Sequence, residues 1–325
     1  MLKKIIKWFD NEAVIIPDDG LNYRANWRKI DLWRVVPFVL LHLACFAVFW
    51  VEFSWFALVF AIALYGIRMF AITGFYHRYF SHKAFRTTRV FQFILAVFGA
   101  TAVQRGPLWW ASHHRHHHIK SDEIDDAHSP VQHGFLWSHL GWFLSNKHFS
   151  TQTERVKELA KFVELRLLDR FDVVVPILFG LSIYLFGMWL ESYYPVLNTN
   201  GMQLLVWGFA ISTVVLYHAT FTVNSLAHVW GDRRYATSDQ SRNNLWIAIF
   251  TLGEGWHNNH HHYPGSARQG FYWWEVDLTY YGLKILAACG LIWDIRTVPK
   301  AIRESKKINR PISAVKKITS SKITS

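Results

Sequence analysis

The stretch WFALVFAIALYGIRMFAITGFYHRYFSH, which runs from Trp55 to His82, decides the fold of this chain. Its first part, up to Thr73, is an apolar run that only Arg68 interrupts, and about 20 apolar residues in a helix are enough to cross a bilayer. His77 and His82 follow directly, and imidazole is a common metal ligand near neutral pH. The stretch therefore predicts a membrane-spanning helix that ends in metal-binding residues at the water boundary.

Three further apolar runs are long enough to cross a bilayer, so we expect four crossings. They extend from Val35 to about Glu52, from Val173 to about Leu190, and from Met202 to about Thr222. The links 52–54 and 191–201 contain no Lys or Arg, whereas the other connecting segments contain nearly all of them. The positive-inside rule then places both termini, the large central loop and all histidine clusters on the cytoplasmic side.

These runs predict an all-α membrane protein, in which four transmembrane helices carry a cytosolic helical cap that holds a histidine-rich site for two metal ions. The predicted parts alternate between cytosol and membrane. The first three are an N-terminal cytosolic segment (1–34), a first transmembrane hairpin (35–73) and a cap segment with two histidine clusters (74–171). The other three are a second hairpin (172–222), a cap segment with the third cluster (223–299) and a basic, disordered tail (300–325).

A shorter apolar stretch, from Val90 to Val103, lies between two histidine clusters. A crossing there would put His77 and His114 on opposite sides of the membrane. We therefore expect a helix that is buried beneath the cap or lies in the membrane interface. A fifth crossing is the alternative.

The formal net charge of +12 arises largely from the tail, which carries eight Lys or Arg residues and one acid from Lys300 onward. A basic tail beside a membrane most simply contacts anionic lipid head groups. No motif supports binding of nucleic acid. We expect the Ser/Thr/Lys-rich end, from Lys316 to Ser325, to be disordered.

Two histidine clusters share the spacing i, i+3, i+4, which lies on one face of a helix. They are His114-Arg-His-His117-His118 and His257-Asn-Asn-His260-His261. Each is expected to aim three imidazoles at a single point. Together with His77, His82 and His228 they make nine candidate ligands, which is enough for two ions with four or five ligands each.

Other residues have weaker roles in this hypothesis. His113, His116 and His262 interleave with the two clusters and point elsewhere on an ideal helix, so they are expected at the surface or behind the ligands. Ligating imidazoles usually pass their second N–H to a carboxylate or carbonyl. The candidates for that supporting role are Asp122, Asp126, Glu254 and, as a neighbour of the two aspartates, His128.

The position of the site beside lipid helps to choose the metal. All-imidazole sites suit Zn, Cu, Fe or Ni, so the ligand type alone does not decide. A two-metal hydrolase would use carboxylates, often as bridges, and would rarely lie at a membrane surface. A pair of redox-active metal ions there suggests oxidation of an apolar substrate by O₂, since breaking an unactivated C–H bond is beyond acid–base side chains.

The ordered histidine motifs resemble those of the membrane fatty acid desaturases, in particular the acyl-CoA (stearoyl-CoA delta-9 type) branch. His77-Arg-Tyr-Phe-Ser-His82 is similar to the first histidine box, Trp110-Ala-Ser-His-His114-Arg-His-His117-His118 to the second, and Gly253-Glu-Gly-Trp-His257-Asn-Asn-His260-His261 to the third. Asn224-Ser-Leu-Ala-His228 is similar to a further ligand motif of the family. The resemblance covers roughly residues 30 to 300.

The resemblance implies a di-iron site whose ligands are His77, His82, His114, His117, His118, His228, His257, His260 and His261, with Asn224 acting through a bound water. It also implies O₂ as co-substrate and removal of two hydrogens from a saturated fatty acyl thioester, acyl-CoA by expectation, to give a cis double bond at delta-9. Zinc can replace iron in purified protein, since imidazole accepts both.

The same resemblance implies that two electrons per turnover come from an external donor, either ferredoxin or a small b-type cytochrome. The chain has no His-Pro-Gly-Gly haem motif and no cysteine cluster for an iron–sulfur centre. One departure concerns the carrier: where animal relatives have Arg-Asp before the second box, which helps to hold CoA, this chain has Ser112-His113. An acyl carrier protein or a lipid-bound acyl chain is the alternative carrier.

Two other functions compete with desaturation. A related membrane di-iron hydroxylase or ketolase would share the histidine boxes but leave oxygen on the product. A non-enzymatic membrane protein that binds or transports metal would place ionisable ligands within the crossings. Here the crossings hold few such residues, namely Arg68, His42 and His218.

Overall fold

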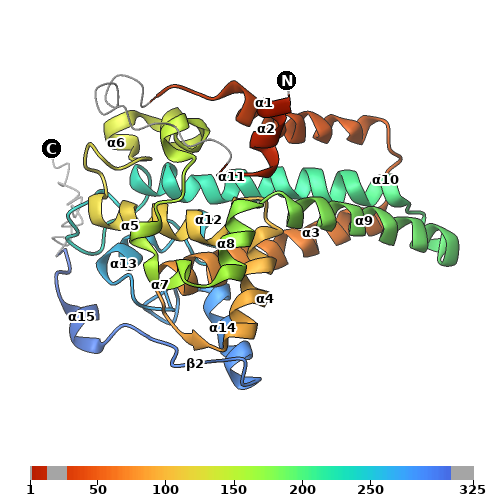
Figure 1. Ribbon diagram of the computed structural model, residues 1–325. Coiled ribbons are helices and arrows are strands. Elements are labelled where there is room, and N and C mark those ends of the chain that lie inside the picture. Colours follow the sequence, from red (N-terminus) through yellow and green to blue (C-terminus); the bar gives the residue numbers. More distant parts are fainter. Residues whose placement is uncertain (1, 13–27, 309–325) are drawn as a thin grey trace, which may run out of the picture.

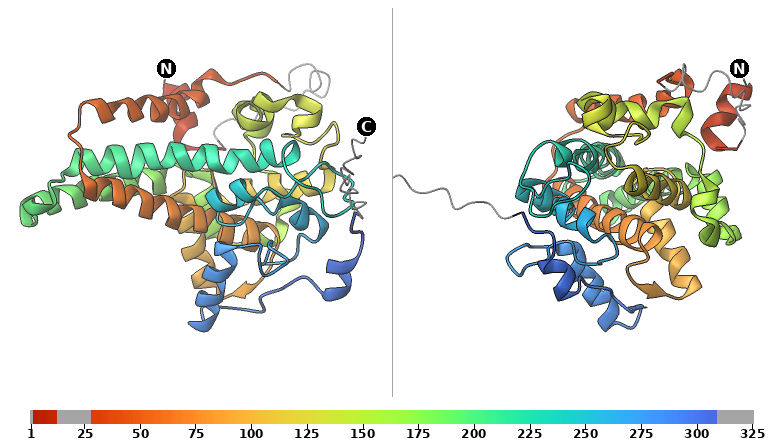
Figure 2. Two further views of the ribbon diagram at one scale, coloured as in Figure 1. Left: turned by 180° about the vertical axis from the view of Figure 1, so that it is seen from behind. Right: turned by 90° about the vertical axis from the view of Figure 1, so that its left-hand side faces the viewer.

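The computed structural model of the protein describes residues 2–12 and 28–308. Within this part of the chain four helical spans are long and apolar enough to cross a membrane: Leu32–Phe49, Trp55–Ser81, Val174–Tyr193 and Gly201–His228. They run along one common direction in the views of Figures 1 and 2. The predicted all-α membrane fold with four spanning helices is confirmed.

Each span is built from one or more helical segments. The first joins α2 (Leu32–Ala44) to a 3₁₀ turn (Cys45–Phe49), and the third is α9 (Val174–Tyr193) alone. The second joins α3 (Trp55–Phe70) to a π-helix (Ala71–Ser81). The fourth comprises α10 (Gly201–Leu204), a π-helix (Leu205–Ile211), α11 (Ser212–Asn224) and a 3₁₀ turn (Leu226–His228).

Two of these spans extend beyond the runs expected from hydropathy. The second continues past Thr73 to Ser81, and the fourth continues past Thr222 to His228. His77, Asn224 and His228 therefore lie on the spanning helices themselves. Hydropathy alone stops at the first polar residues, whereas the helical hydrogen bonds continue because these polar side chains are buried in the cap.

The remaining elements form the cap and its edges. They are α1 (Leu2–Phe9), β1 (Arg86–Thr87), α4 (Arg89–Ala100), α5 (Pro107–Lys120), α6 (Pro130–His133), α7 (Lys157–Ala160), α8 (Val163–Arg170), α12 (Leu245–Phe250), α13 (His257–His262), α14 (Leu278–Ala288), β2 (Ile292–Trp293) and α15 (Lys300–Glu304). β1 and β2 pair antiparallel, with Arg86 opposite Trp293. In Figure 1, α5, α13 and α15 lie at the end of the molecule opposite the turn between α9 and α10.

Arg68 is buried inside the second span, where an unpaired cation would be costly. Its guanidinium donates to the Thr213 hydroxyl at 2.6 Å, to the Ser212 hydroxyl and to the Thr101 carbonyl at 3.3 Å. The charge that interrupts the apolar run is thus satisfied by polar groups of the fourth span and of the segment after α4.

The apolar stretch between the first two histidine clusters forms α4, which at 12 residues is too short to be a candidate span. Leu95 and Ala96 are buried in the core, whereas Val90 is 73% exposed. Among the described residues α4 is thus not a fifth candidate crossing, and one of its faces packs in the core while the other is exposed.

The expected disordered tail begins with ordered structure. Lys300–Glu304 form α15, and the backbone N–H of Ala236 donates to the carbonyl of Lys306 at 2.8 Å. Residues 309–325, which include the predicted disordered end from Lys316 to Ser325, lie outside the described residues.

Candidate metal centre

The first histidine pair owes its geometry to the π-helix at the end of the second span. His77 and His82 are five residues apart, and the backbone N–H of His82 donates to the carbonyl of His77 at 3.3 Å, the i→i+5 bond of a π-helix. This winding stacks residues five apart, and the centroids of the two imidazole rings are 4.9 Å apart. An ordinary α-helix would point the two rings in different directions.

The two longer clusters lie on α5 and α13, and both divide their histidines in the same way. His114 and His118, the i and i+4 residues of α5, join one group of imidazoles, while His117 at i+3 joins another. On α13, His257 and His261 join the second group and His260 joins the first. The expectation that each cluster aims three rings at one point is therefore wrong. Residues four apart are nearly superposed along a helix, whereas the i+3 residue is rotated to the other side of them.

The nine predicted ligands thus form two groups, each with one nitrogen per ring within 4.8 Å of the others. The first group holds five residues: His77, His82, His114, His118 and His260. The second holds four residues: His117, His228, His257 and His261. This division agrees in number with the four or five ligands per ion that the sequence predicted.

The Nε2 atoms are the atoms that converge. In the first group, His118 Nε2 lies 3.0 Å from His114 Nε2 and 2.9 Å from His260 Nε2, and His77 Nε2 lies 3.0 Å from His260 Nε2. In the second group, His228 Nε2 and His257 Nε2 are 3.0 Å apart. One ring nitrogen cannot share protons with several others at once, so this packing leaves lone pairs facing one another.

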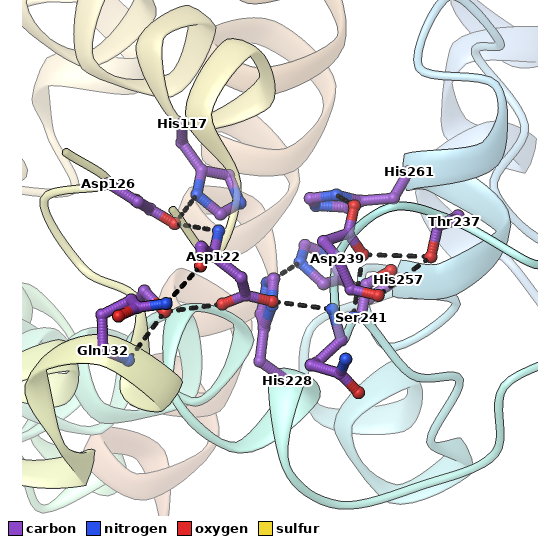
Figure 3. A network of polar contacts seen from close by, with 12 residues as sticks. His117, Asp122, Asp126, Gln132, His228, Thr237, Asp239, Ser241, His257 and His261 are labelled. Atoms are coloured by element: carbon purple, nitrogen blue, oxygen red, sulfur yellow. Dashed lines mark hydrogen bonds and ion pairs between the residues drawn. The ribbon is translucent and has the colours of Figure 1, made fainter. Parts of the chain in front are cut away.

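Carboxylates fix the opposite nitrogen of four of these rings. The Nδ1 atoms of His117, His228 and His261 lie 3.0, 2.9 and 2.8 Å from carboxylate oxygens of Asp126, Asp122 and Asp239, respectively (Figure 3). His77 Nδ1 contacts Glu254 in the same way. An ionised carboxylate only accepts, so each of these rings carries its proton on Nδ1 and presents a free lone pair on Nε2.

The supporting carboxylates are themselves held in place. Asp122 accepts the hydroxyl of Ser129 at 2.7 Å and the backbone N–H of Gln240 at 2.7 Å. Behind His77, Glu254 accepts from Arg78 at 3.0 Å and from the Gln269 amide at 3.0 Å. Such bonds keep the imidazole rings in a fixed orientation.

Burial and mutual repulsion keep most of the rings neutral. Burial, reinforced by neighbouring imidazoles, holds the pKa values of His82, His114, His118, His257 and His260 well below the usual range. Burial lowers the pKa of His261 to about 4, although Asp239 opposes the shift. Burial would raise the pKa of Asp122, but the hydrogen bond and charge of His228 lower it to about 2. Burial also opposes ionisation of His117, but the charge and hydrogen bond of Asp126 raise its pKa. At neutral pH the six rings with lowered pKa values are therefore neutral.

His261 shows that the residues present fit a metal ion. Its side chain is 1% exposed, and its buried Nε2 atom has no hydrogen-bond partner in the part of the chain that the structure describes. Leaving such an atom unpaired in a buried site is unfavourable, and a metal ion removes that penalty. Two neighbouring groups of imidazole nitrogens match the preference of Fe or Zn for such ligands.

Two adjoining cavities connect the site with the spanning helices. A cavity of about 230 Å³ is lined by α2, α9 and α11 residues such as Phe38, Pro176 and Tyr217, and it extends to His114 and Asn224. A smaller one of about 30 Å³ is lined by residues of both imidazole groups and also by Asn224. Asn224, the predicted ligand through water, thus lies where the two cavities meet.

His128 belongs to neither imidazole group but packs directly on one of the ligand rings. Its ring packs against that of His117 at 4.3 Å between centroids, and its Nδ1 lies 3.9 Å from Asp126. Ser112 and His113 are buried, and His113 Nε2 donates to the carbonyl of Ser150 at 3.2 Å. This pair stands where animal relatives have Arg-Asp, and of the two only His113 lines the large cavity.

Sequence reasoning missed Asp239 and Gln269. Asp239 accepts from His261, and Gln269 donates to Glu254 and lies 3.3 Å from His77 Nδ1. The available signal for Asp239 was a carboxylate between the motif at His228 and the third cluster. No spacing rule ties it to His261, because the loop that carries it folds back onto α13.

Comparison with known proteins agrees with these motifs. The family model described as "Fatty acid desaturase" matches residues 53–285. The delta-9 acyl-lipid desaturase 1 of Arabidopsis thaliana is 33% identical over 277 residues, which are 84% of this chain and 86% of that protein. The acyl-CoA C20 delta5-desaturase of Anemone leveillei is 36% identical over 291 residues, 88% of each chain. The sn-2 palmitoyl-lipid 9-desaturase of Nostoc sp. is 33% identical over 296 residues, which cover 89% of this chain and 96% of that protein.

Proposed function

The chain belongs to the fatty acid desaturase family, and from that premise we propose that it introduces a cis double bond at delta-9 of a saturated fatty acyl thioester. The proposed reaction consumes O₂, two electrons and two protons and releases two waters. The observation that carries this proposal is the pair of convergent imidazole groups at the end of an apolar cavity.

The nine imidazoles would hold two iron ions, five ligands for one ion and four for the other, with Asn224 contributing through a water molecule. When bound, such a pair supplies the oxidising power that cleavage of an unactivated C–H bond requires. Asp122, Asp126, Asp239 and Glu254 hold the proton on Nδ1 of their imidazoles, so that Nε2 remains free. Zinc would bind the same nitrogens without supplying redox chemistry.

The large cavity supports an elongated apolar substrate. Aromatic and aliphatic side chains of three spanning helices form much of its lining. The lining also includes His114 and Asn224 of the metal centre, and the cations Lys7, Arg34 and Arg105. An acyl chain that lies in the cavity would be held by apolar contacts, with its mid-chain carbons near the metal ligands and its polar head near the cations.

The family members named above differ in the carrier of their acyl substrate, since the name of one specifies acyl-CoA and the names of two specify lipids. Lys7, Arg34 and Arg105 line the cavity, and Asp31 and Asp172 pair with them, which leaves one net positive charge that favours a phosphate-bearing carrier such as CoA. Ser112 and His113 lack the charged pair with which the animal relatives hold CoA. A lipid ester is therefore the second candidate substrate.

We also propose that both termini and the metal centre face the cytoplasm. This rests on the absence of Lys and Arg from the links 52–54 and 191–201. Cysteine labelling at an exposed position of each link, from either side of sealed vesicles, would test the orientation.

One experiment tests the reaction and the carrier together. Iron-reconstituted protein in liposomes receives a reductant system with either stearoyl-CoA or a distearoyl lipid, and the fatty acids are analysed by gas chromatography and mass spectrometry. Oleate from stearoyl-CoA supports the full proposal, and oleate from the lipid alone supports the second substrate. A product heavier by one oxygen would identify a hydroxylase, and no product from either source would contradict desaturation.

A further inference from the structure

The proposed reaction needs two electrons from outside the chain, and this inference rests on that proposed function. The sequence contains only two cysteines and no haem motif, so the chain has no recognisable electron-storing centre besides the metal pair. Electrons must therefore pass through the protein surface, and the described residues include a surface suited to that passage.

This surface, called here the basic patch, surrounds the half-buried ring of Tyr272. The guanidinium carbons of Arg234 and Arg303 lie 4.8 and 5.2 Å from the centre of that ring, and Lys307 Nζ lies 5.5 Å from it. Exposed Lys300 and Lys306 belong to the same C-terminal segment and complete the patch.

In the described part of the chain, two carboxylates form ion pairs with these five cations. Glu275 is buried and contacts Arg234, and Glu304 contacts both Arg303 and Lys307. The patch therefore carries a net positive charge. Such a charge attracts an acidic partner over long range and accelerates the encounter.

Two stacked rings connect the basic patch with the metal ligands. Tyr235 is fully buried, and its ring stacks on that of His262 with a centroid distance of 4.0 Å and an interplanar angle of 5°. Both rings are bonded to α15, since the Tyr235 hydroxyl donates to the carbonyl of Arg303 at 2.9 Å and His262 Nε2 donates to that of Ile302 at 2.8 Å. His262 directly follows His261, which belongs to the four-histidine group.

The position of α15 favours a soluble partner over a lipid surface. In Figure 1, α15 lies at the end of the molecule farthest from the turn between α9 and α10, where the spanning helices end. A bilayer that surrounds the four spans would therefore leave this end of the cap in water.

We propose that the basic patch is the docking surface for an acidic one-electron carrier protein, and that the Tyr235–His262 stack is the route by which its electrons reach His261 and the metal pair. Each docking event oxidises one carrier by one electron, so two events supply one turnover. The substrate loses two hydrogens, and O₂ with two electrons and two protons gives two waters.

The first test measures docking without any turnover. The zinc-loaded protein in nanodiscs of neutral lipid is titrated with an oxidised, acidic [2Fe–2S] ferredoxin, and separately with a small acidic b-type cytochrome. The double variant Lys306→Glu/Lys307→Glu should weaken the Kd of the preferred carrier at least about tenfold at low salt. Salt screens the difference, so it should nearly vanish at about 0.5 M NaCl.

The matched control makes the same charge change elsewhere in the cap. Lys157→Glu/Lys161→Glu alters two exposed lysines at α7, and its Kd should stay within about twofold of wild type. An unchanged Kd in the patch variant would overturn the docking proposal. Loss of binding to phosphatidylserine vesicles, with carrier binding intact, would instead assign the patch to lipid.

The second test addresses the route of the electrons. His262→Leu removes the stacked ring and should slow reoxidation of the reduced carrier at saturating concentration, whereas Tyr235→Phe keeps the stack and should not. The Kd of the carrier and the bound metal should be unchanged in both variants. Equal reoxidation rates in His262→Leu and wild type would exclude this route.

The outcomes also separate this proposal from the proposed function. If wild type forms no unsaturated product but the patch variant loses carrier binding, desaturation fails and the docking surface stands. If wild type forms the product and the patch variant binds the carrier normally, desaturation stands and the docking surface fails.

Discussion

Asp239 offers the sharpest test of how the protein tunes its metal ligands. Its carboxylate accepts from His261 Nδ1 at 2.8 Å, from the Ser241 backbone N–H at 2.9 Å and from the Thr237 hydroxyl at 3.1 Å. Asp239→Asn retains an acceptor oxygen but removes the negative charge behind the imidazole. Asp239→Ala removes both, and leaves the His261 N–H without its acceptor.

The size of the effect follows from this geometry. Loss of a carboxylate behind a ligating imidazole typically weakens metal binding 10- to 100-fold, or about 1.4–2.7 kcal/mol. We expect Asp239→Asn near the lower limit and Asp239→Ala near the upper one. Only the ion held by the four-histidine group should be affected, because His261 does not belong to the five-histidine group.

The assay is a zinc titration of metal-free protein in detergent against a chromophoric chelator, fitted with two binding constants. Asp232→Asn is the matched control, since Asp232 is exposed on the same segment and lies outside both imidazole groups. One weakened constant beside an unchanged one supports the reasoning. Two unchanged constants would refute the role of Asp239, and equal weakening of both would indicate a general disturbance of the fold.

Three further predictions concern other parts of the molecule. His260→Ala should lower the metal content from two ions to about one per chain and abolish turnover, with helicity unchanged by circular dichroism; two retained ions would contradict the ligand assignment. Gly99→Ala should destabilise the protein by about 1–3 kcal/mol, because a Cβ there would lie 2.0 Å from the buried Tyr76 ring. Its control, Gly66→Ala, meets no atom within 4 Å and should leave the thermal midpoint unchanged or raised. Burial raises the pKa of Asp169 from 3.8 to about 6, so the folded state binds this proton more tightly than the unfolded state does. The protein should therefore lose up to about 3 kcal/mol of its free energy of unfolding as the pH rises from 4 to 7. Asp169→Asn should flatten that part of the pH–stability curve, and an unchanged slope would show that Asp169 does not titrate there.

Much of the fold follows from composition along the chain. Apolar runs of about 20 residues predict spanning helices because the bilayer demands internally satisfied backbone bonds, and all four runs form such helices. Their ends were harder to predict. The second span continues through polar residues to Ser81 because Arg78 is buried and bonded to Glu254 and Asp277, contacts that arise only in the folded cap.

For the site, too, features set by neighbouring residues in the sequence could be predicted, whereas contacts between distant segments could not. The i, i+3, i+4 spacing on α5 and α13 identifies the histidines that converge, and helical geometry fixes which of them share a face. Helical geometry explains why the i+3 ring turns away from the other two, but the partners that each ring meets depend on how α5 and α13 face each other. Asp239 was missed for a related reason, because only the folded loop brings its carboxylate to His261.

The central claim is that nine imidazoles hold two neighbouring iron ions, and X-ray absorption at the iron edge tests it most directly. Anaerobically reconstituted protein should bind two irons per chain and show a nitrogen shell with the multiple scattering typical of imidazole, without sulfur. A single iron per chain, or a spectrum without imidazole scattering, would contradict the account.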